Sequence, residues 1–260
     1  MLQQTQTARV TVLLPLFLKK FPSINVLAAA SPGEVLMAWK GMGYNNRAIR
    51  LHALAKKVVA DHRGKIPSSV DLLLSLPGIG PYTAHAVACF AFGKQVPVVD
   101  VNIHRILSRW FKKDLSMAAA WRVAEELLPD TKAYDWNQAM MDLGATVCTA
   151  SSPMCIICPA RSFCKSAFAP KTVQKERSKK NEPSRKGVPN RIYRGKIVEY
   201  LRTHPGYGRA KKIAETVFPK FTSLENVWFF SLLTDLEKDR LITVKKSGKT
   251  SLDWKVQLID

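Results

Sequence analysis

Apolar residues recur at helical spacing through most of the first 147 residues of the chain. Two sets show this most clearly: Val12, Leu13 and Leu16, and then Leu51, Leu54, Ala55 and Val58. Because residues three or four positions apart share one face of a helix, each set predicts an amphipathic helix. The segment from Ser31 to Glu34 reads as a capping box with proline at the first helical position. Alternation typical of strands is scarce before residue 190, so we expect this region to be mainly helical.

A second hydrophobic pattern begins at residue 191 and predicts a small separate module. Helices are expected over 192–201, 210–217 and 224–236, and extended segments over 241–244 and 252–258. The two extended segments are joined by the basic turn KKSGK. Three helices followed by a basic hairpin are typical of a winged helix, and a small α+β packing module is the alternative.

Charge changes this picture by indicating the kind of partner. The 260 residues include 40 lysines and arginines against 20 acidic residues, which gives a formal net charge of +20. An excess of this size favours a polyanionic partner, and nucleic acid is the commonest one. The first residues, MLQQTQTARV, lack the basic and apolar regions of a signal peptide, and no apolar run approaches a membrane span. We therefore expect a cytoplasmic protein that is associated with the nucleoid and has no membrane partner.

The stretch between the two patterns is rich in lysine and arginine and almost free of apolar residues. Such a composition predicts a linker, either a solvated spacer or a tether that contacts nucleic acid. The sequence thus predicts three parts: a helical domain over 1–168, a basic linker over 169–190 and a winged-helix-like domain over 191–260.

Four of the five cysteines are packed into seventeen residues with the spacing C-x6-C-x2-C-x5-C: Cys148, Cys155, Cys158 and Cys164. Four soft thiolates from one loop form a closed site that suits an iron–sulfur cluster or zinc. Zinc sites usually pair two C-x2-C knuckles and this loop has one, so we favour a [4Fe–4S] cluster. A disulfide pair is the third alternative, but nothing in the sequence indicates secretion. The remaining cysteine, Cys89, is expected to be a small buried hydrophobic residue.

A glycine-containing turn, LPGIGPYTA at 76–84, links two helical patterns. Glycine permits positive φ and lets the backbone approach a ligand closely. The amides of Gly78 and Gly80 can face a phosphate, although an ordinary helix–helix turn is the alternative. Further along, Asp100 follows an apolar stretch and immediately precedes a helical pattern. This aspartate can act as an N-cap, or it can stabilise positive charge on a substrate.

Taken in order, LPGIGPYTA, VVDVNIHR and the cysteine loop resemble the helix-hairpin-helix (HhH-GPD) base-excision DNA glycosylases, the superfamily of endonuclease III and the adenine glycosylases. The segments MLQQTQ, GMGYNNRA and NQAMMDLGATVC are similar to the adenine glycosylase (MutY-like) branch in particular. The resemblance covers about residues 1–167. It implies a mainly α, two-subdomain helix-hairpin-helix glycosylase fold with an iron–sulfur loop at 148–164, to which this chain adds the winged-helix-like α+β module. It also implies that the target base is flipped into a pocket between the subdomains.

The resemblance assigns three catalytic positions. Asp100 matches the aspartate that stabilises the oxocarbenium-like sugar, and Asn102 matches the asparagine beside it. Tyr82 occupies the position where the bifunctional lyases have a Schiff-base lysine. A phenol cannot form an imine with the sugar, so the resemblance implies a monofunctional hydrolase.

The resemblance also assigns DNA contacts and metal ligands. Gln4 matches a glutamine that fills space near the orphan base, and Tyr44 lies in the G-x-G-Tyr segment that reaches the lesion. Gly78 and Gly80 match the hairpin amides that bind a DNA phosphate. The four cysteines match the ligands of the [4Fe–4S] cluster. Arg161 and Lys165 lie in the same loop, where they can reach the DNA backbone: the assigned DNA-binding set is Gln4, Tyr44, Gly78, Gly80, Arg161 and Lys165.

The chain departs from the adenine glycosylase pattern in three ways. The glutamate that protonates the departing adenine lies a few residues before the segment that matches Met1–Gln6, so no residue of this sequence is assigned that role. The family usually has a second tyrosine where this chain has Asn45. The C-terminal pattern is that of a winged helix and differs from the Nudix-like domain with which those enzymes recognise 8-oxoguanine.

We therefore expect a monomeric DNA repair glycosylase that acts on double-stranded DNA containing a mismatch or a damaged base. The favoured reaction is excision of adenine mispaired with guanine or 8-oxoguanine. A thymine or uracil mismatch glycosylase is one alternative, because such enzymes can share the Tyr82 and Asp100 positions without the glutamate. A non-catalytic DNA-binding protein is the other.

Overall fold

The computed structural model describes residues 1–168, 182–219, 221–248 and 250–260. The chain packs as two compact units, one of Met1–Lys65 with Lys179–Asp260 and the other of Ile66–Ser178. These units divide the chain differently from the predicted domains, because the first 65 residues pack with the C-terminal module. Residues 169–181 of the predicted linker lie outside the described residues. No helix within the described residues is both long and apolar enough to cross a membrane.

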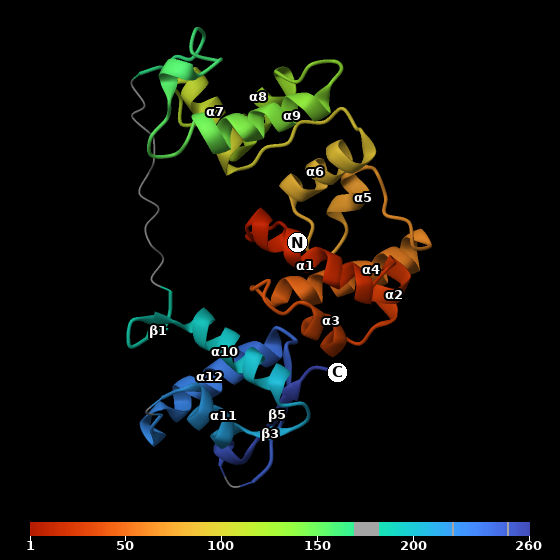
Figure 1. Cartoon of the computed structure of the whole chain (residues 1–260), viewed down its shortest axis with the longest axis vertical. Coiled ribbons are helices and arrows are strands. Elements are labelled where there is room, and N and C mark those ends of the chain that lie inside the picture. Colours follow the sequence, from red (N-terminus) through yellow and green to blue (C-terminus); the bar gives the residue numbers. More distant parts are fainter. Residues whose placement is uncertain (169–181, 220, 249) are drawn as a thin grey trace. The chain divides into compact units, whose positions relative to one another are not determined.

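The unit over Ile66–Ser178 is built from helices around the predicted turn and cysteine loop (Figure 1). In order they are α5 (Val70–Leu74), α6 (Pro81–Phe92), α7 (Val101–Phe111), α8 (Met117–Glu126) and α9 (Ala133–Asp142). A π-helical turn, η1 (Leu143–Val147), extends α9, and a 3-10 turn, η2 (Cys155–Ile157), lies in the cysteine loop. Helix α7 supplies the centre of the core with Ile103, Ile106 and Leu107. Cys89 is fully buried against Val98, as the sequence predicted.

The other unit begins with α1 (Thr7–Lys20), α2 (Ile24–Ala29), α3 (Pro32–Ala38) and α4 (Asn46–His62). The predicted capping box at the start of α3 is confirmed: the Glu34 amide donates to Ser31 Oγ, and the Ser31 amide donates back to the Glu34 carboxylate. The predicted apolar face of α1 was wrong. Val10 and Phe17 are buried, whereas Val12 is 67% exposed. Apolar residues occur all around this helix, so their spacing alone could not select the buried face.

The C-terminal part of this unit has the element order of a winged helix (Figure 1). Its elements are α10 (Asn190–Thr203), β3 (Gly208–Arg209), α11 (Ala210–Val217), η3 (Ser223–Glu225), α12 (Asn226–Lys238), β4 (Ile242–Lys245), η4 (Ser251–Asp253) and β5 (Lys255–Leu258). The three strands form an antiparallel sheet in the order β3-β5-β4. The strand expected over 252–258 starts only at Lys255, because a capping box between Thr250 and Asp253 closes the 3-10 turn η4 first.

A short hairpin precedes the C-terminal helices. Strands β1 (Ser184–Arg185) and β2 (Val188–Pro189) pair antiparallel within the stretch that the sequence predicted to be linker. The hairpin is held in place because the Tyr193 hydroxyl donates to the carbonyl of Arg185, whose guanidinium lies over the Trp228 ring. The described end of the predicted linker is therefore packed structure.

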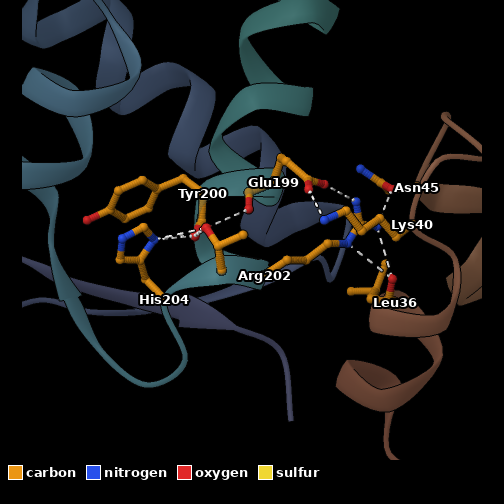
Figure 2. Close-up of polar contacts among 8 residues, drawn as sticks. Leu36, Lys40, Asn45, Glu199, Tyr200, Arg202 and His204 are labelled. Carbon is orange, nitrogen blue, oxygen red and sulfur yellow. Dashed lines mark hydrogen bonds and ion pairs between the residues drawn. The ribbon is translucent and has the colours of Figure 1, made fainter.

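The N-terminal helices and the C-terminal module share one hydrophobic core, and Arg202 joins them on one side of it. Figure 2 shows the Arg202 side chain directed from α10 toward α3. Its guanidinium donates to the carbonyl oxygen of Leu36 at 3.0 Å and to Asn45 Oδ1 at 2.8 Å. It also pairs with Glu199, which in turn pairs with Lys40 at 2.9 Å. Asn45, at the position where the resemblance implies a second tyrosine, thus contacts the C-terminal module.

Replacing Arg202 with methionine should lower the free energy of unfolding of this unit by about 2–4 kcal/mol, because a buried carbonyl and Glu199 would lose their charged donor. Arg191→Met is the matched control. Arg191 lies on the same helix and its ion pair with Glu182 is exposed, so its loss should cost less than about 1 kcal/mol. Urea denaturation of the two variants measures the difference. Equal losses would mean that Arg202 does not fasten the module.

Candidate active site and metal centre

The glycine turn between α5 and α6 has the geometry that the sequence predicted at one of its two glycines. Gly78 has φ +81°, which a residue with a side chain adopts only with strain, whereas Gly80 is extended with φ −99°. A Cβ on Gly80 would meet no atom within 4 Å, so this point of the backbone is open to a ligand. In the described part of the chain, neither glycine amide donates to a backbone carbonyl. Both amides are free to bind a phosphate, directly before the N-terminus of α6.

Asp100 stands at the N-terminus of α7 and caps it. Its Oδ1 accepts hydrogen bonds from the backbone amides of Asn102 at 2.8 Å and Ile103 at 2.7 Å. Its Oδ2 accepts one from the Asn102 side chain at 3.0 Å. The apolar stretch that leads to Asp100 is fixed by the buried Asn137, which accepts from the Val98 amide at 2.9 Å. The carboxylate is thus held in one orientation, and it remains only half-buried.

Tyr82 lies in the first turn of α6, close enough to Asp100 for the two to interact electrostatically. Burial, and next the negative charge of Asp100, raises the pKa of the Tyr82 phenol above its ordinary value. Tyr82 therefore stays a neutral phenol at physiological pH. The structure brings together two of the predicted catalytic residues, and Asn102 joins them through its bond to Asp100.

A chain of hydrogen bonds runs from Asp100 to the cysteine loop. Asn102 accepts from Arg105 at 2.9 Å, and Arg105 donates to the carbonyls of Gly144 and Cys148, both at 2.8 Å. Gly144 belongs to the π-helical turn η1, where a Cβ would lie 2.8 Å from the Asn102 Cβ. The close approach of η1 and α7 therefore requires glycine at this position.

A second arginine on α7 fixes the start of the loop. Arg109 is buried and donates to the carbonyls of Thr149 at 2.7 Å and Ala150 at 2.9 Å. It also lies 3.2 Å from the sulfur of Cys148. Hydrogen bonds from a charged donor to a carbonyl or a thiolate are stronger than hydrogen bonds between neutral groups. The first cysteine of the loop is thus positioned by the helix that carries Asp100.

All four loop cysteines line a single cavity, together with Arg109, Trp110 and Arg161 among others. Within the described residues, no three histidine, cysteine or carboxylate side chains converge closely enough to hold a single ion. A cubane cluster binds each thiolate to a separate iron, so its ligands stand farther apart than those around one zinc. Burial raises the pKa of the Cys164 thiol, and the other three cysteines add to this effect. A cationic group in the cavity would favour the thiolate form of Cys164 and so oppose this rise in its pKa.

The two basic residues predicted in the cysteine loop are both exposed. Arg161 donates to the carbonyl of Ile156 at 3.3 Å, and the backbone amide of Lys165 donates to the carbonyl of Trp110. Their charged ends are therefore available to solvent or to a partner. Their role in DNA binding stays a prediction.

In the other unit, Gln4 and Tyr44 lie on two loops that are tied together by Arg47. Both residues have positive φ, +57° and +44°, and both are exposed. Arg47 donates to the carbonyls of Met1 and Met42, both at 2.9 Å, and to the Thr5 hydroxyl at 2.6 Å. Its guanidinium also lies over the Tyr44 ring, with 5.7 Å to the ring centroid. These contacts bring two of the predicted DNA-binding residues to one surface.

Sequence reasoning missed three arginines that organise these sites: Arg47, Arg105 and Arg109. Two of them stood inside the motifs GMGYNNRA and VVDVNIHR. Spacing gave only a weak signal, since Arg105 and Arg109 are one helical turn apart and share one face of α7. Nothing in the sequence indicated that their acceptors would be backbone carbonyls of a distant loop.

The fold and the arrangement of these site residues together indicate one class of protein. A hairpin with open amides, an aspartate at the next helix N-terminus and a four-cysteine loop are the features on which the resemblance to the helix-hairpin-helix DNA glycosylases rests. The family described as HhH-GPD superfamily base excision DNA repair protein matches residues 1–127. The adenine DNA glycosylase of Mycolicibacterium smegmatis is 43% identical over 209 residues, which are 78% of this chain and 69% of that protein. This chain belongs to the HhH-GPD superfamily of DNA N-glycosylases, among its adenine DNA glycosylases.

Three further relatives show how far the likeness extends. The adenine DNA glycosylase of Buchnera aphidicola is 32% identical over 253 residues, 93% of this chain and 71% of that protein. The human adenine DNA glycosylase is 41% identical over 172 residues, 64% of this chain but 32% of that protein. The chain likewise spans 54% of the length of the Mycobacterium tuberculosis relative.

Solved structures agree with the fold. A thermostable thymine-DNA glycosylase has a TM-score of 0.60 and 33% identity, covering 63% of this chain and 78% of that one. An endonuclease III trapped as a covalent intermediate with DNA has a TM-score of 0.58 and 25% identity, with the same coverage. The predicted fold class, a mainly helical helix-hairpin-helix glycosylase, is confirmed.

Proposed function

We propose that this protein hydrolyses the N-glycosidic bond of adenine mispaired with guanine or 8-oxoguanine in duplex DNA. The arrangement of Asp100 supports the cleavage of the glycosidic bond most directly, and the adenine DNA glycosylases among the relatives support the choice of base. Its carboxylate is fixed at a helix N-terminus, half-buried and next to a neutral phenol. A fixed negative charge in such a place stabilises a sugar that becomes positively charged as the base departs.

Each residue of the site has a separate role in this reaction. The target nucleotide leaves the stack, and the amides of Gly78 and Gly80 bind its backbone. Asp100 stabilises the developing charge on the sugar while Asn102 keeps the carboxylate in place. The bond between the sugar carbon and the base breaks, and the base leaves with the electron pair. Water then adds to the sugar carbon, and the proton that this water loses balances the proton that the departed base takes up. Tyr82 has no amine with which to form an imine, so the strand stays intact at the abasic position.

The cysteines fit a [4Fe–4S] cluster as structural cofactor: four thiolates line one cavity, and Arg109 lies against the first of them. When bound, the cluster would order the cysteine loop over 148–164. Through Arg105 and Arg109, that order supports the helix that carries Asp100.

Single-turnover excision tests the proposed function. The full natural protein is incubated with duplexes that carry adenine opposite guanine, adenine opposite 8-oxoguanine, thymine opposite guanine, uracil opposite guanine or matched pairs. We expect adenine release from the first two only, with strand breaks appearing only after alkali. Release of thymine or uracil instead would favour the mismatch glycosylase, to whose class one similar structure belongs. No release from any duplex would leave a non-catalytic DNA-binding protein.

A further inference from the structure

Three basic residues form one row across the outer face of the C-terminal sheet. The strand register pairs Arg209 with Lys255 and Lys255 with Lys245. Directly paired residues project from the same face of a sheet, so the three side chains are neighbours. All three are exposed. The opposite face carries residues such as Val256, which is fully buried in the core.

The row is not neutralised within the described residues. None of the three side chains takes part in an ion pair there. The nearby Asp253 is engaged with the amide and hydroxyl of Thr250. Like charges directly opposite each other in a sheet are destabilising, so such a row lowers the stability of the free protein. A bound polyanion would remove that repulsion.

Aromatic rings hold the lysines at the edge of this face. Lys245 lies over the Tyr207 ring with 4.3 Å between the ammonium nitrogen and the ring centroid, and Lys246 lies 5.4 Å from the centroid of Trp254. A lysine placed over a ring loses part of its rotational freedom before any ligand arrives. The charge of the row is therefore partly pre-organised.

Helix α12 makes a poor alternative surface for a polyanion. In helix-turn-helix proteins the last helix of the motif usually enters the DNA groove. Here apolar residues are exposed at the start of this helix and just before it: Val227 in the first turn of α12 is 84% exposed, and Leu224 in η3 is 92% exposed. Asp235 is exposed further along the same helix and would repel phosphates. Charge complementarity favours the sheet face over the helix.

We propose that Arg209, Lys255 and Lys245 form a binding site for the phosphate backbone of duplex DNA, independent of base sequence. The choice of DNA as the polyanion rests on the proposed function, while the site itself rests on the strand register and the exposed charges. This site is additional to the hairpin amides. It holds the protein on undamaged duplex without contact to a lesion.

The experiment measures affinity for an undamaged duplex as a function of salt. The triple variant Arg209→Gln, Lys245→Gln, Lys255→Gln is compared with Lys196→Gln, Lys212→Gln, Lys238→Gln, which removes the same charge from exposed positions outside the row. Each lost phosphate contact lowers the slope of log affinity against log salt by about 0.9. We expect the row variant to lose about 2 to 3 in slope and roughly 10- to 100-fold in affinity at low salt. The control should lose much less.

Lys255→Glu separates binding from folding. An acid at the centre of the row would face Arg209 and Lys245, so it should leave the thermal midpoint equal or higher while it weakens duplex binding. An unchanged slope in the triple variant, or equal slopes for variant and control, would overturn the proposal. So would a loss that appears only with single-stranded DNA or with an acidic protein. Because the duplex is undamaged, failure of base excision would leave this result intact and would count against the proposed function alone.

Discussion

Replacing Asp100 with asparagine should slow single-turnover base excision by roughly 100-fold or more, while affinity for the duplex changes little. Asparagine keeps an oxygen that can accept the two amide bonds at the start of α7, so the helix stays capped. What it loses is the negative charge beside the sugar. Its new NH2 group would also face the NH2 group of Asn102, which now donates to the carboxylate.

Two comparisons make this result interpretable. Asp100→Ser retains a capping oxygen without an amide donor, so it should be as slow as the asparagine variant if charge is what matters. Asp135→Asn removes an exposed carboxylate from the first turn of α9 and should excise at the parental rate. Excision rates that are equal in the parent and in Asp100→Asn would reduce this aspartate to a helix cap.

Replacing one of the four proposed cluster ligands should greatly reduce the iron content of the protein. Protein purified without oxygen should contain about four irons per chain, as a [4Fe–4S] cluster requires. Cys158→Ser should lose most of this iron. The loop would also be cut by protease roughly 10-fold faster or more, because metal binding to such loops is coupled to their folding.

The fifth cysteine supplies the control for that experiment. Cys89 is fully buried in another cluster of the core, where its sulfur accepts a hydrogen bond from the side chain of Asn137 at 3.3 Å. Cys89→Ala should therefore keep the full iron content. Stoichiometric zinc in the parent, or iron that survives in Cys158→Ser, would contradict the assignment of the cluster.

Sequence patterns predicted elements well wherever one local interaction decides the structure. The capping box at Ser31 and the cap by Asp100 each depend on residues two or three positions apart, so the letters alone indicate them. The positive φ of Gly78 has the same origin. By contrast, strand β3 is two residues long and exists only because Gly208 and Arg209 pair with β5. Such a short segment leaves no alternating pattern.

The sequence predicted Asp100 and the four cysteines of the candidate site, but it did not predict the hydrogen bonds that connect them. The residues that we propose to meet substrate or metal have distinctive chemistry, so Asp100 and the cysteines were identified from the sequence. The contacts between them are made by arginines to backbone carbonyls, and any residue supplies a carbonyl. The hydrogen bonds from Arg105 to Gly144 and Cys148 therefore carry no sequence signature. Packing of the C-terminal module through Arg202 was missed for the same reason.

The π-helical turn between α9 and Cys148 sets a limit on insertions and deletions in this chain. Such a turn holds one more residue than an α-helical turn. Loss of one residue between Gly144 and Cys148 would convert this turn into a regular α-helical one and would remove the hydrogen bond from the Cys148 amide to the Leu143 carbonyl, which spans five residues. It would also change the spacing of the Gly144 and Cys148 carbonyls, which Arg105 binds together, whatever residues remained. In this stretch the number of residues is constrained as strictly as their identity, and protein variants that differ in length here should be far rarer than variants that differ in side chain.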